Sequence, residues 1–190
     1  MDFEKVSHFY KIFSAFPRIE LKRVRLREFR DSDAKGYYDY INNPEVSKFV
    51  PDDCIPRSVE STVRDLQYYK ESMQRYEGIS WAIAHKKTDE IIGSASLSMM
   101  KFLQRKSNIA YDLAFEYWGK GIAKEAVSAI INFADNELKL DRIQANIAVH
   151  NERSRNFSKF FGFEHEGTMR KFEILEGKMC DFDIFARIRK

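Results

Sequence analysis

The spacing of apolar residues along the chain predicts a series of helices and strands that begins with an aromatic helix. In the first sixteen residues the apolar side chains recur at helical spacing, and Pro17 ends the pattern. This stripe consists of Phe3, Val6, Phe9, Tyr10, Phe13 and Phe16. It has to be buried either against its own domain or against a partner. We therefore expect residues 1–19 to form a helical extension and residues 20–190 to form one domain.

Beyond this helix, seven segments are typical of strands and four of helices. The expected strands lie at 24–29, 79–84, 91–97, 108–114, 143–149, from 163 onward and at 179–188. The expected helices run to about Ile41 after a cap at 31–33, and over 58–76, 122–138 and 151–161. Strands outnumber helices, and several strands follow one another directly. This order predicts an α+β protein with a mixed sheet rather than a doubly wound one.

Composition removes several classes of protein. The chain has 190 residues, of which 44% are hydrophobic and 32% charged, so a packed core with a polar surface is expected. No stretch approaches the roughly 18 apolar residues of a membrane helix. The net charge of +3 is too small for a dedicated nucleic-acid binder. Charges interrupt the N-terminus, so we expect no signal peptide and a cytoplasmic location.

The cysteines and histidines predict no metal site. Cys54 and Cys180 form no C-x-x-C pair, and the four histidines have no ligand spacing. Cys180 also has no histidine nearby in sequence that would make it a nucleophile. We therefore expect chemistry that uses neither a metal nor a cysteine.

The segment 117–126 connects an expected strand to a long helix and carries two glycines. Gly119 and Gly121 allow the backbone to turn tightly and to approach a ligand closely. The free N–H groups and the dipole of the following helix favour an anion such as pyrophosphate. The Rossmann pattern fails at Lys124 and the P-loop pattern at Ala114. From these residues alone, the turn is either structural or a ligand loop.

The same segment resembles the acetyl-CoA signature Q/R-x-x-G-x-G/A of the GCN5-related N-acetyltransferases, with Trp118 at the Gln/Arg position. Its Tyr-Trp-Gly-Lys-Gly form is similar to the subgroup that acetylates the N-termini of ribosomal proteins. The N-x-x-S of that subgroup is matched at 151–154, and its G-F-x-x-x-G ending at 162–167. The resemblance covers residues 20–188 and is most specific from Leu113 onward.

This resemblance implies a GNAT fold, with a mixed sheet of about seven strands and about four flanking helices beside the extra N-terminal helix. The sheet would splay between its fourth and fifth strands, 108–114 and 143–149. Acetyl-CoA is implied as the cosubstrate, with its pantetheine arm in that gap. The residues implied to bind it are Leu113, Phe115, Gly119, Lys120, Gly121, Ile122, Ala123, Asn151 and Ser154.

The reaction implied is direct attack of an amine on the thioester, with an N–H near Leu113 polarising the carbonyl. Glu173 aligns with the base proposed for the ribosomal subgroup, and Ser154 with its proposed proton donor to the thiolate. Glu173 could equally be a solvated carboxylate and Ser154 a helix-start serine. Ser158 stands where many family members carry a tyrosine acid, so no phenol is available from that position.

The acceptor is expected to bind near Tyr37 and Tyr38, with Asp181 orienting its amine. An α-amine, with a pKa of about 7.7–8.0, is neutral near pH 7 far more often than a lysine side chain. Three functions stay open: acetylation of a protein N-terminus, as in ribosomal proteins; acetylation of a small amine such as a polyamine, aminoglycoside or amino-acid derivative; and non-catalytic acyl-CoA binding. Nucleic acid and membrane are not expected as direct partners, and a homodimer is left open.

Overall fold

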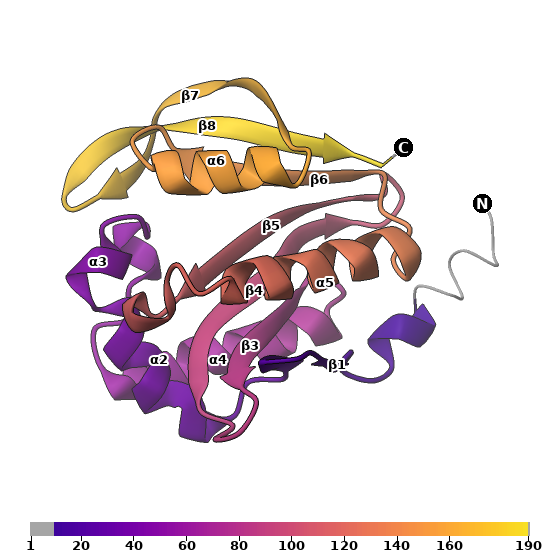
Figure 1. The fold of residues 1–190 in the computed structure, drawn as a ribbon, viewed down its shortest axis with the longest axis vertical. Helices are drawn as coiled ribbons and strands as arrows, with labels where there is room; N and C mark the ends of the chain where they lie inside the picture. Colours follow the sequence, from indigo (N-terminus) through magenta and orange to yellow (C-terminus); the bar gives the residue numbers. More distant parts are fainter. Residues whose placement is uncertain (1–9, 190) are drawn as a thin grey trace.

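Eight strands form one mixed sheet in the computed structural model, which describes residues 10–189 (Figure 1). Along the sheet the order is β1-β2-β3-β4-β5-β6-β8-β7. The strands are β1 Ile19–Glu20, β2 Val24–Arg27, β3 Ile79–His85, β4 Ile91–Lys101, β5 Lys106–Leu113, β6 Arg142–Ala148, β7 Glu164–Leu175 and β8 Lys178–Ile188. Among these eight described strands, only β5 and β6 pair in parallel. The expected mixed α+β sheet is confirmed, and the added strand is β1, whose two residues are too few to show a period.

Helices cover both faces of the sheet (Figure 1). They are α2 Ala34–Ile41, α3 Pro44–Ser47, α4 Val59–Gln74, α5 Ile122–Asn136 and α6 Glu152–Phe160, with short 3-10 turns η1 Asp31–Asp33, η2 Asp52–Cys54 and η3 Phe115–Tyr117. A larger core joins the sheet to α5, and a second core lies under α2 and α4. Within residues 10–189, no helix combines the length and the apolar character needed to cross a membrane.

Local sequence explains where the main helices begin. Ser58 caps α4 by accepting a hydrogen bond from the Ser61 N–H at 3.1 Å. Asp33 is the N-cap residue of α2, as the 31–33 segment predicts, but its carboxylate does not cap the helix. It instead receives the Arg27 guanidinium through two hydrogen bonds of 2.7 and 2.8 Å. A buried ion pair therefore takes the place of the expected cap.

The expected N-terminal helix is described only in part, because residues 1–9 lie outside the described range. Residues 10–13 are helical, and Phe13 is buried in the larger core. Phe16 packs edge-on against Trp81 at 6.3 Å, and the Trp81 indole donates to the Pro17 carbonyl at 2.7 Å. The described part of the aromatic stripe therefore packs on its own domain.

The sheet splays between β5 and β6. These strands pair only through residues 106–108 and 142–144, although each continues beyond them. The Ala114 N–H donates a hydrogen bond to the Ile92 carbonyl of β4. In an antiparallel pair, every second residue of a strand bonds to its neighbour, so the N–H and C=O groups of Tyr111 and Leu113 point away from β4. They face the gap, which thus offers a peptide edge to an extended ligand. The expected splay is confirmed.

Candidate functional site

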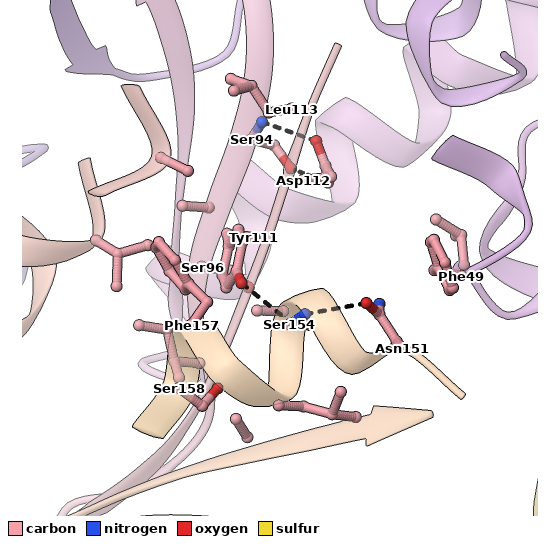
Figure 2. A pocket seen from close by; sticks show the side chains of 18 of the residues that line it. Phe49, Ser94, Ser96, Tyr111, Asp112, Leu113, Asn151, Ser154, Phe157 and Ser158 are labelled. Atoms are coloured by element: carbon pink, nitrogen blue, oxygen red, sulfur yellow. Dashed lines mark hydrogen bonds between the residues drawn. The ribbon is translucent and has the colours of Figure 1, made fainter. Parts of the chain in front are cut away.

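A cavity of ≈ 860 Å³ occupies the splay and its two sides (Figure 2). Tyr111 and Asp112 are successive residues of β5, so their side chains point to opposite faces of the sheet. Both nevertheless line the cavity, together with Ser154 of α6 and Tyr37 of α2. The cavity therefore passes through the sheet, from the α6 side to the α2 side.

Most of the site residues expected from the sequence meet in this one cavity. Those that line it are Tyr37, Leu113, Gly119, Gly121, Ile122, Ala123, Asn151, Ser154 and Glu173. They come from α2, β5, the 119–123 turn with the start of α5, the start of α6, and β7. The tertiary structure thus gathers segments separated by more than a hundred residues of sequence.

Four expected residues are not part of the cavity lining: Tyr38, Phe115, Lys120 and Asp181. The Phe115 side chain is exposed beside Trp118, and the Lys120 ammonium lies 5.5 Å from the centre of the Tyr117 ring. Asp181 accepts a hydrogen bond from the Lys171 N–H at 2.7 Å, within the bulge between β7 and β8. Main-chain contacts from residues 115 and 120 stay predictions.

The 119–123 turn lines the cavity at the start of α5, where the first N–H groups of a helix lack intrahelical partners. Gly119 and Gly121 have φ values of +73° and +75°, a region that favours glycine, and Gly121 is the N-cap residue of α5. No side chain of the described residues caps this helix. A Cβ added at Gly119 would meet nothing within 4 Å. The turn therefore leaves the helix start open to an anion, as pyrophosphate binding requires.

Arg23 stabilises the conformation of this turn from outside the cavity. Its guanidinium donates to the carbonyls of Lys120 and Gly121, the latter at 2.9 Å, and to Glu125 of α5 at 2.7 Å. Although burial acts to raise it, hydrogen bonds from Arg23 hold the pKa of the Glu125 carboxyl below its usual value. With the carbonyls engaged on this side, the N–H groups are left to face a ligand. Nothing in the sequence connects Arg23 to a turn 97 and 98 residues away.

Trp118, at the position of the signature's Gln/Arg, supports the strand end next to the turn. Its indole N–H donates to the Leu113 carbonyl at 2.6 Å, and the Arg153 guanidinium lies 4.2 Å from its ring centre. Because the indole takes the Leu113 carbonyl, the N–H of that residue is the main-chain group left for a ligand in the gap. This arrangement fits a donor to a thioester oxygen.

On the α6 side, the hydroxyl groups of Tyr111 and Ser154 are hydrogen-bonded to each other (Figure 2). Asn151 caps α6 by accepting from the Ser154 N–H at 3.0 Å, and the Ser154 oxygen lies 3.1 Å from the Tyr111 oxygen. Burial raises the pKa of Tyr111 to about 12, so the phenol stays protonated. The sequence identified Ser154 and the lack of a phenol at 158, but not that β5 supplies one. The alternation of β5 places Tyr111 on one face of the strand with Ile109 and Leu113 and carries no other signal.

On the α2 side, Asp112 accepts three hydrogen bonds, and Figure 2 shows it beside Ser94, which donates two of them. They come from the Ser94 N–H at 2.9 Å, the Ser94 hydroxyl at 2.6 Å and the Tyr40 hydroxyl at 2.7 Å. Burial raises the pKa of the Asp112 carboxyl despite these donors. The sequence did not indicate a role for Asp112, because a single acid in a strand gives no sign of what faces it.

Glu173 lines the cavity from β7, near Cys54 of η2. Burial raises the pKa of the Cys54 thiol to about 11, and the negative charges of Asp53 and Glu173 add to the shift. Cys54 is therefore a neutral thiol rather than a nucleophile.

A clasp joins η2 to the turn between β7 and β8. Both carboxylate oxygens of Asp52 accept main-chain N–H groups, from Glu176 and Gly177, at 2.8 Å each. Pro51 and Cys54 on one side of the clasp, and Glu173 on the other, line the cavity. Within residues 10–189, no group of three or more side chains is placed to hold a metal ion.

Comparison with known proteins assigns this architecture to a family. Residues 23–164 match the model of the acetyltransferase (GNAT) domain. The chain is 30% identical over 170 residues to the uncharacterized N-acetyltransferase p20 of Bacillus licheniformis, covering 89% of this chain and 94% of that protein. It is 26% identical over 183 residues to the ribosomal protein uS5-alanine N-acetyltransferase of Escherichia coli, covering 91% and 92%.

Solved structures agree with these sequence matches. The ribosomal-protein-S5-alanine acetyltransferase of Vibrio fischeri superimposes with a TM-score of 0.79 at 26% identity, covering 90% of this chain and 96% of that one. The GNAT model spans β2 to the start of β7 and thus includes the splay, the 119–123 turn and Ser154. The chain therefore belongs to the GNAT family of N-acetyltransferases, whose cosubstrate is acetyl-CoA.

Proposed function

We propose that the protein transfers the acetyl group of acetyl-CoA to the α-amine of a protein N-terminus, as in ribosomal-protein acetylation. The observation that carries this proposal is the cavity through the sheet, which connects the anion-binding turn at 119–123 to Glu173 and Tyr37. Relatives named for ribosomal-protein alanine and serine acetylation support this acceptor class. The proposal includes action in the cytoplasm and leaves a homodimer open.

Acetyl-CoA fits the α6 side of the cavity. The N–H groups at the start of α5 would bind the pyrophosphate, and Asn151 would contact the pantetheine arm along the β5 edge. The Leu113 N–H would donate to the thioester oxygen, which gains negative charge as the amine attacks. These assignments use main-chain groups that the splay leaves open.

The transfer requires two proton movements. Glu173 would accept a proton from the ammonium form of the acceptor, and the neutral amine would then attack the carbonyl carbon. As the C–N bond forms and the C–S bond breaks, Ser154 would donate a proton to the departing thiolate. Glu173 and Ser154 line the same cavity, which supports this division of roles.

One observation favours the alternative acceptor, a small primary amine. The two hydrogen bonds accepted by Asp52 hold η2 against the β7–β8 turn, beside Glu173. This contact would leave less space on that side of the cavity for a peptide acceptor. Polyamines, aminoglycosides and amino-acid derivatives are acceptors of this kind. They belong in the same test as the peptides.

The test is an acetyl-CoA binding titration followed by measurement of free-thiol release. The acceptors are short peptides that begin with Ser or Ala, polyamines and aminoglycosides. Release on peptides supports the proposal, whereas release on small amines alone replaces the acceptor class. Binding without release from any acceptor favours a non-catalytic acyl-CoA module, and lack of acetyl-CoA binding rejects the function.

Glu173→Gln tests the base, with Glu164→Gln as the matched control on the exposed end of β7. The first variant should bind acetyl-CoA as the wild type does but turn over about 100-fold or more slowly. The control should keep the wild-type rate. Equal rates for Glu173→Gln and the wild type would remove Glu173 from the mechanism.

A further inference from the structure

Asp112 is a carboxylate inside the cavity that has no cationic partner. Its three hydrogen-bond donors, the Ser94 N–H, the Ser94 hydroxyl and the Tyr40 hydroxyl, are all neutral. Among residues 10–189, no Lys, Arg or His side chain forms an ion pair with it. The residue still lines the cavity and is only half-buried. A charge in such surroundings is costly unless a cation comes to it.

The titratable groups around Asp112 do not supply that cation. Tyr37 and Tyr40 of α2, Tyr69 of α4 and Cys54 of η2 face this region. Burial raises the pKa of each of these four groups, so all are neutral near pH 7. Glu173 is the other carboxylate of the lining, whereas the two cations of the lining, Lys124 and Arg153, come from α5 and α6. This side of the cavity is therefore suited to a positively charged ligand.

The walls of the same region are aromatic. Phe29, Tyr37 and Tyr69 line the cavity, and the rings of Phe29 and Tyr69 stack at 5.4 Å. Aromatic faces attract ammonium groups through their negative π-clouds, and more strongly where water is excluded. Carboxylate and rings together form a receptor for an ammonium ion rather than for a neutral or acidic group.

The position of Asp112 along β5 relates it to the reaction. Its neighbour Leu113 offers the N–H that suits the thioester oxygen, and the Asp112 side chain points to the face opposite Tyr111 and Ser154. An amine held by Asp112 would thus approach the thioester from the α2 side, while the thiolate leaves on the α6 side. The two faces of one strand would separate acceptor from leaving group.

We propose that Asp112 is the acceptor-binding carboxylate, and that it selects a primary ammonium ion. This inference rests on the proposed acetyl transfer and names how that site recognises its acceptor. The ammonium donates hydrogen bonds to Asp112, and one of its protons passes to Glu173. The resulting neutral amine stays hydrogen-bonded to Asp112 as its lone pair attacks the acetyl carbon. Asp112 is thus a binding residue, and Glu173 remains the base.

The experiment uses alaninamide, which carries an α-ammonium, and lactamide, in which a hydroxyl replaces it. Each is titrated by calorimetry into the wild-type protein with saturating CoA, so turnover is not required. Alaninamide should bind at least about 10-fold more tightly than lactamide, because a hydrogen bond from a charged group is stronger than a neutral one. Equal affinities would overturn the inference without any variant.

Asp112→Asn gives the second arm, with Asp39→Asn on the exposed surface of α2 as the matched control. Asp112→Asn should weaken alaninamide binding about 10-fold or more, raise the KM of the amine acceptor more than it lowers kcat, and leave acetyl-CoA affinity unchanged. Unchanged alaninamide affinity in a folded variant contradicts the inference. If the wild type fails to bind acetyl-CoA, the proposed function itself falls, and this outcome is separate from the alaninamide comparison.

Discussion

The phenol oxygen of Tyr111 lies 3.1 Å from the hydroxyl oxygen of Ser154, which links β5 to α6 at the wall of the cavity. Because burial raises the pKa of Tyr111 to about 12, this phenol keeps its proton at neutral pH. A serine hydroxyl that gives up a proton can regain one from such a neighbour. The pair thus provides a phenol on the α6 side, although position 158 holds a serine.

Ser154→Ala should lower the rate of thiol release by about 100-fold if Ser154 protonates the thiolate. Tyr111→Phe should lower it less, by about 10-fold, because Ser154 keeps its own proton and loses only its neighbour. Single-turnover measurements on both variants check these values, with Tyr68→Phe on the exposed surface of α4 as the control. Wild-type rates in Ser154→Ala would make water the donor.

Arg23→Met should weaken acetyl-CoA binding by about 10-fold while leaving the fold intact. The change removes the donors that hold the carbonyls of residues 120 and 121, so the turn loses its preorganised conformation. Equilibrium titration with acetyl-CoA measures the effect. Lys22→Met, one residue earlier and also exposed, removes the same charge without touching the turn. An equal loss in both variants would indicate a long-range charge effect instead.

Arg27→Ala should destabilise the protein by about 3–5 kcal/mol, because it leaves the Asp33 carboxylate buried without its partner. The Arg27 and Asp33 side chains are 1% and 6% exposed, and two hydrogen bonds join them. Urea unfolding gives the free energy. Adding Asp33→Asn to Arg27→Ala should recover part of the loss. A loss below about 1 kcal/mol for Arg27→Ala would mean that water reaches Asp33.

The contribution of Asp112 to stability should depend on pH. Burial raises the pKa of this carboxyl above its ordinary value of 3.8, so the folded state binds its proton more tightly than the unfolded state. The cost of the buried charge is therefore absent below pH 3.8, grows as the pH rises, and is complete above the raised pKa. Thermal unfolding of Asp112→Asn and the wild type at several pH values measures this cost. The variant should gain stability relative to the wild type as the pH rises above 3.8, until Asp112 is fully charged in the folded protein.

The fold was largely predictable from the sequence because its main elements are periodic. The expected bounds of β3, β4, β6 and α5 lie within one or a few residues of the observed ones. The strands show alternating apolar residues, and the helix shows an apolar face. The capping of α2 was less predictable, because the Asp33 carboxylate has a competing partner in Arg27. At this position, the local preference of Asp33 for capping the helix is outweighed by a buried ion pair, which the spacing of the two residues in sequence does not reveal.

By itself, the sequence determined the class of protein and the position of the glycine turn before α5, because two closely spaced glycines before a helix and the motif around them are local features. Only the tertiary structure decided which side chains meet. Arg23 reaches the turn from just before β2, Tyr111 reaches Ser154 from β5, and Asp112 faces the aromatic residues of α2 and α4. Each of these contacts depends on how the sheet splays and which face a residue occupies. Both are set by packing between segments far apart in the chain, for which a sequence pattern carries no signal.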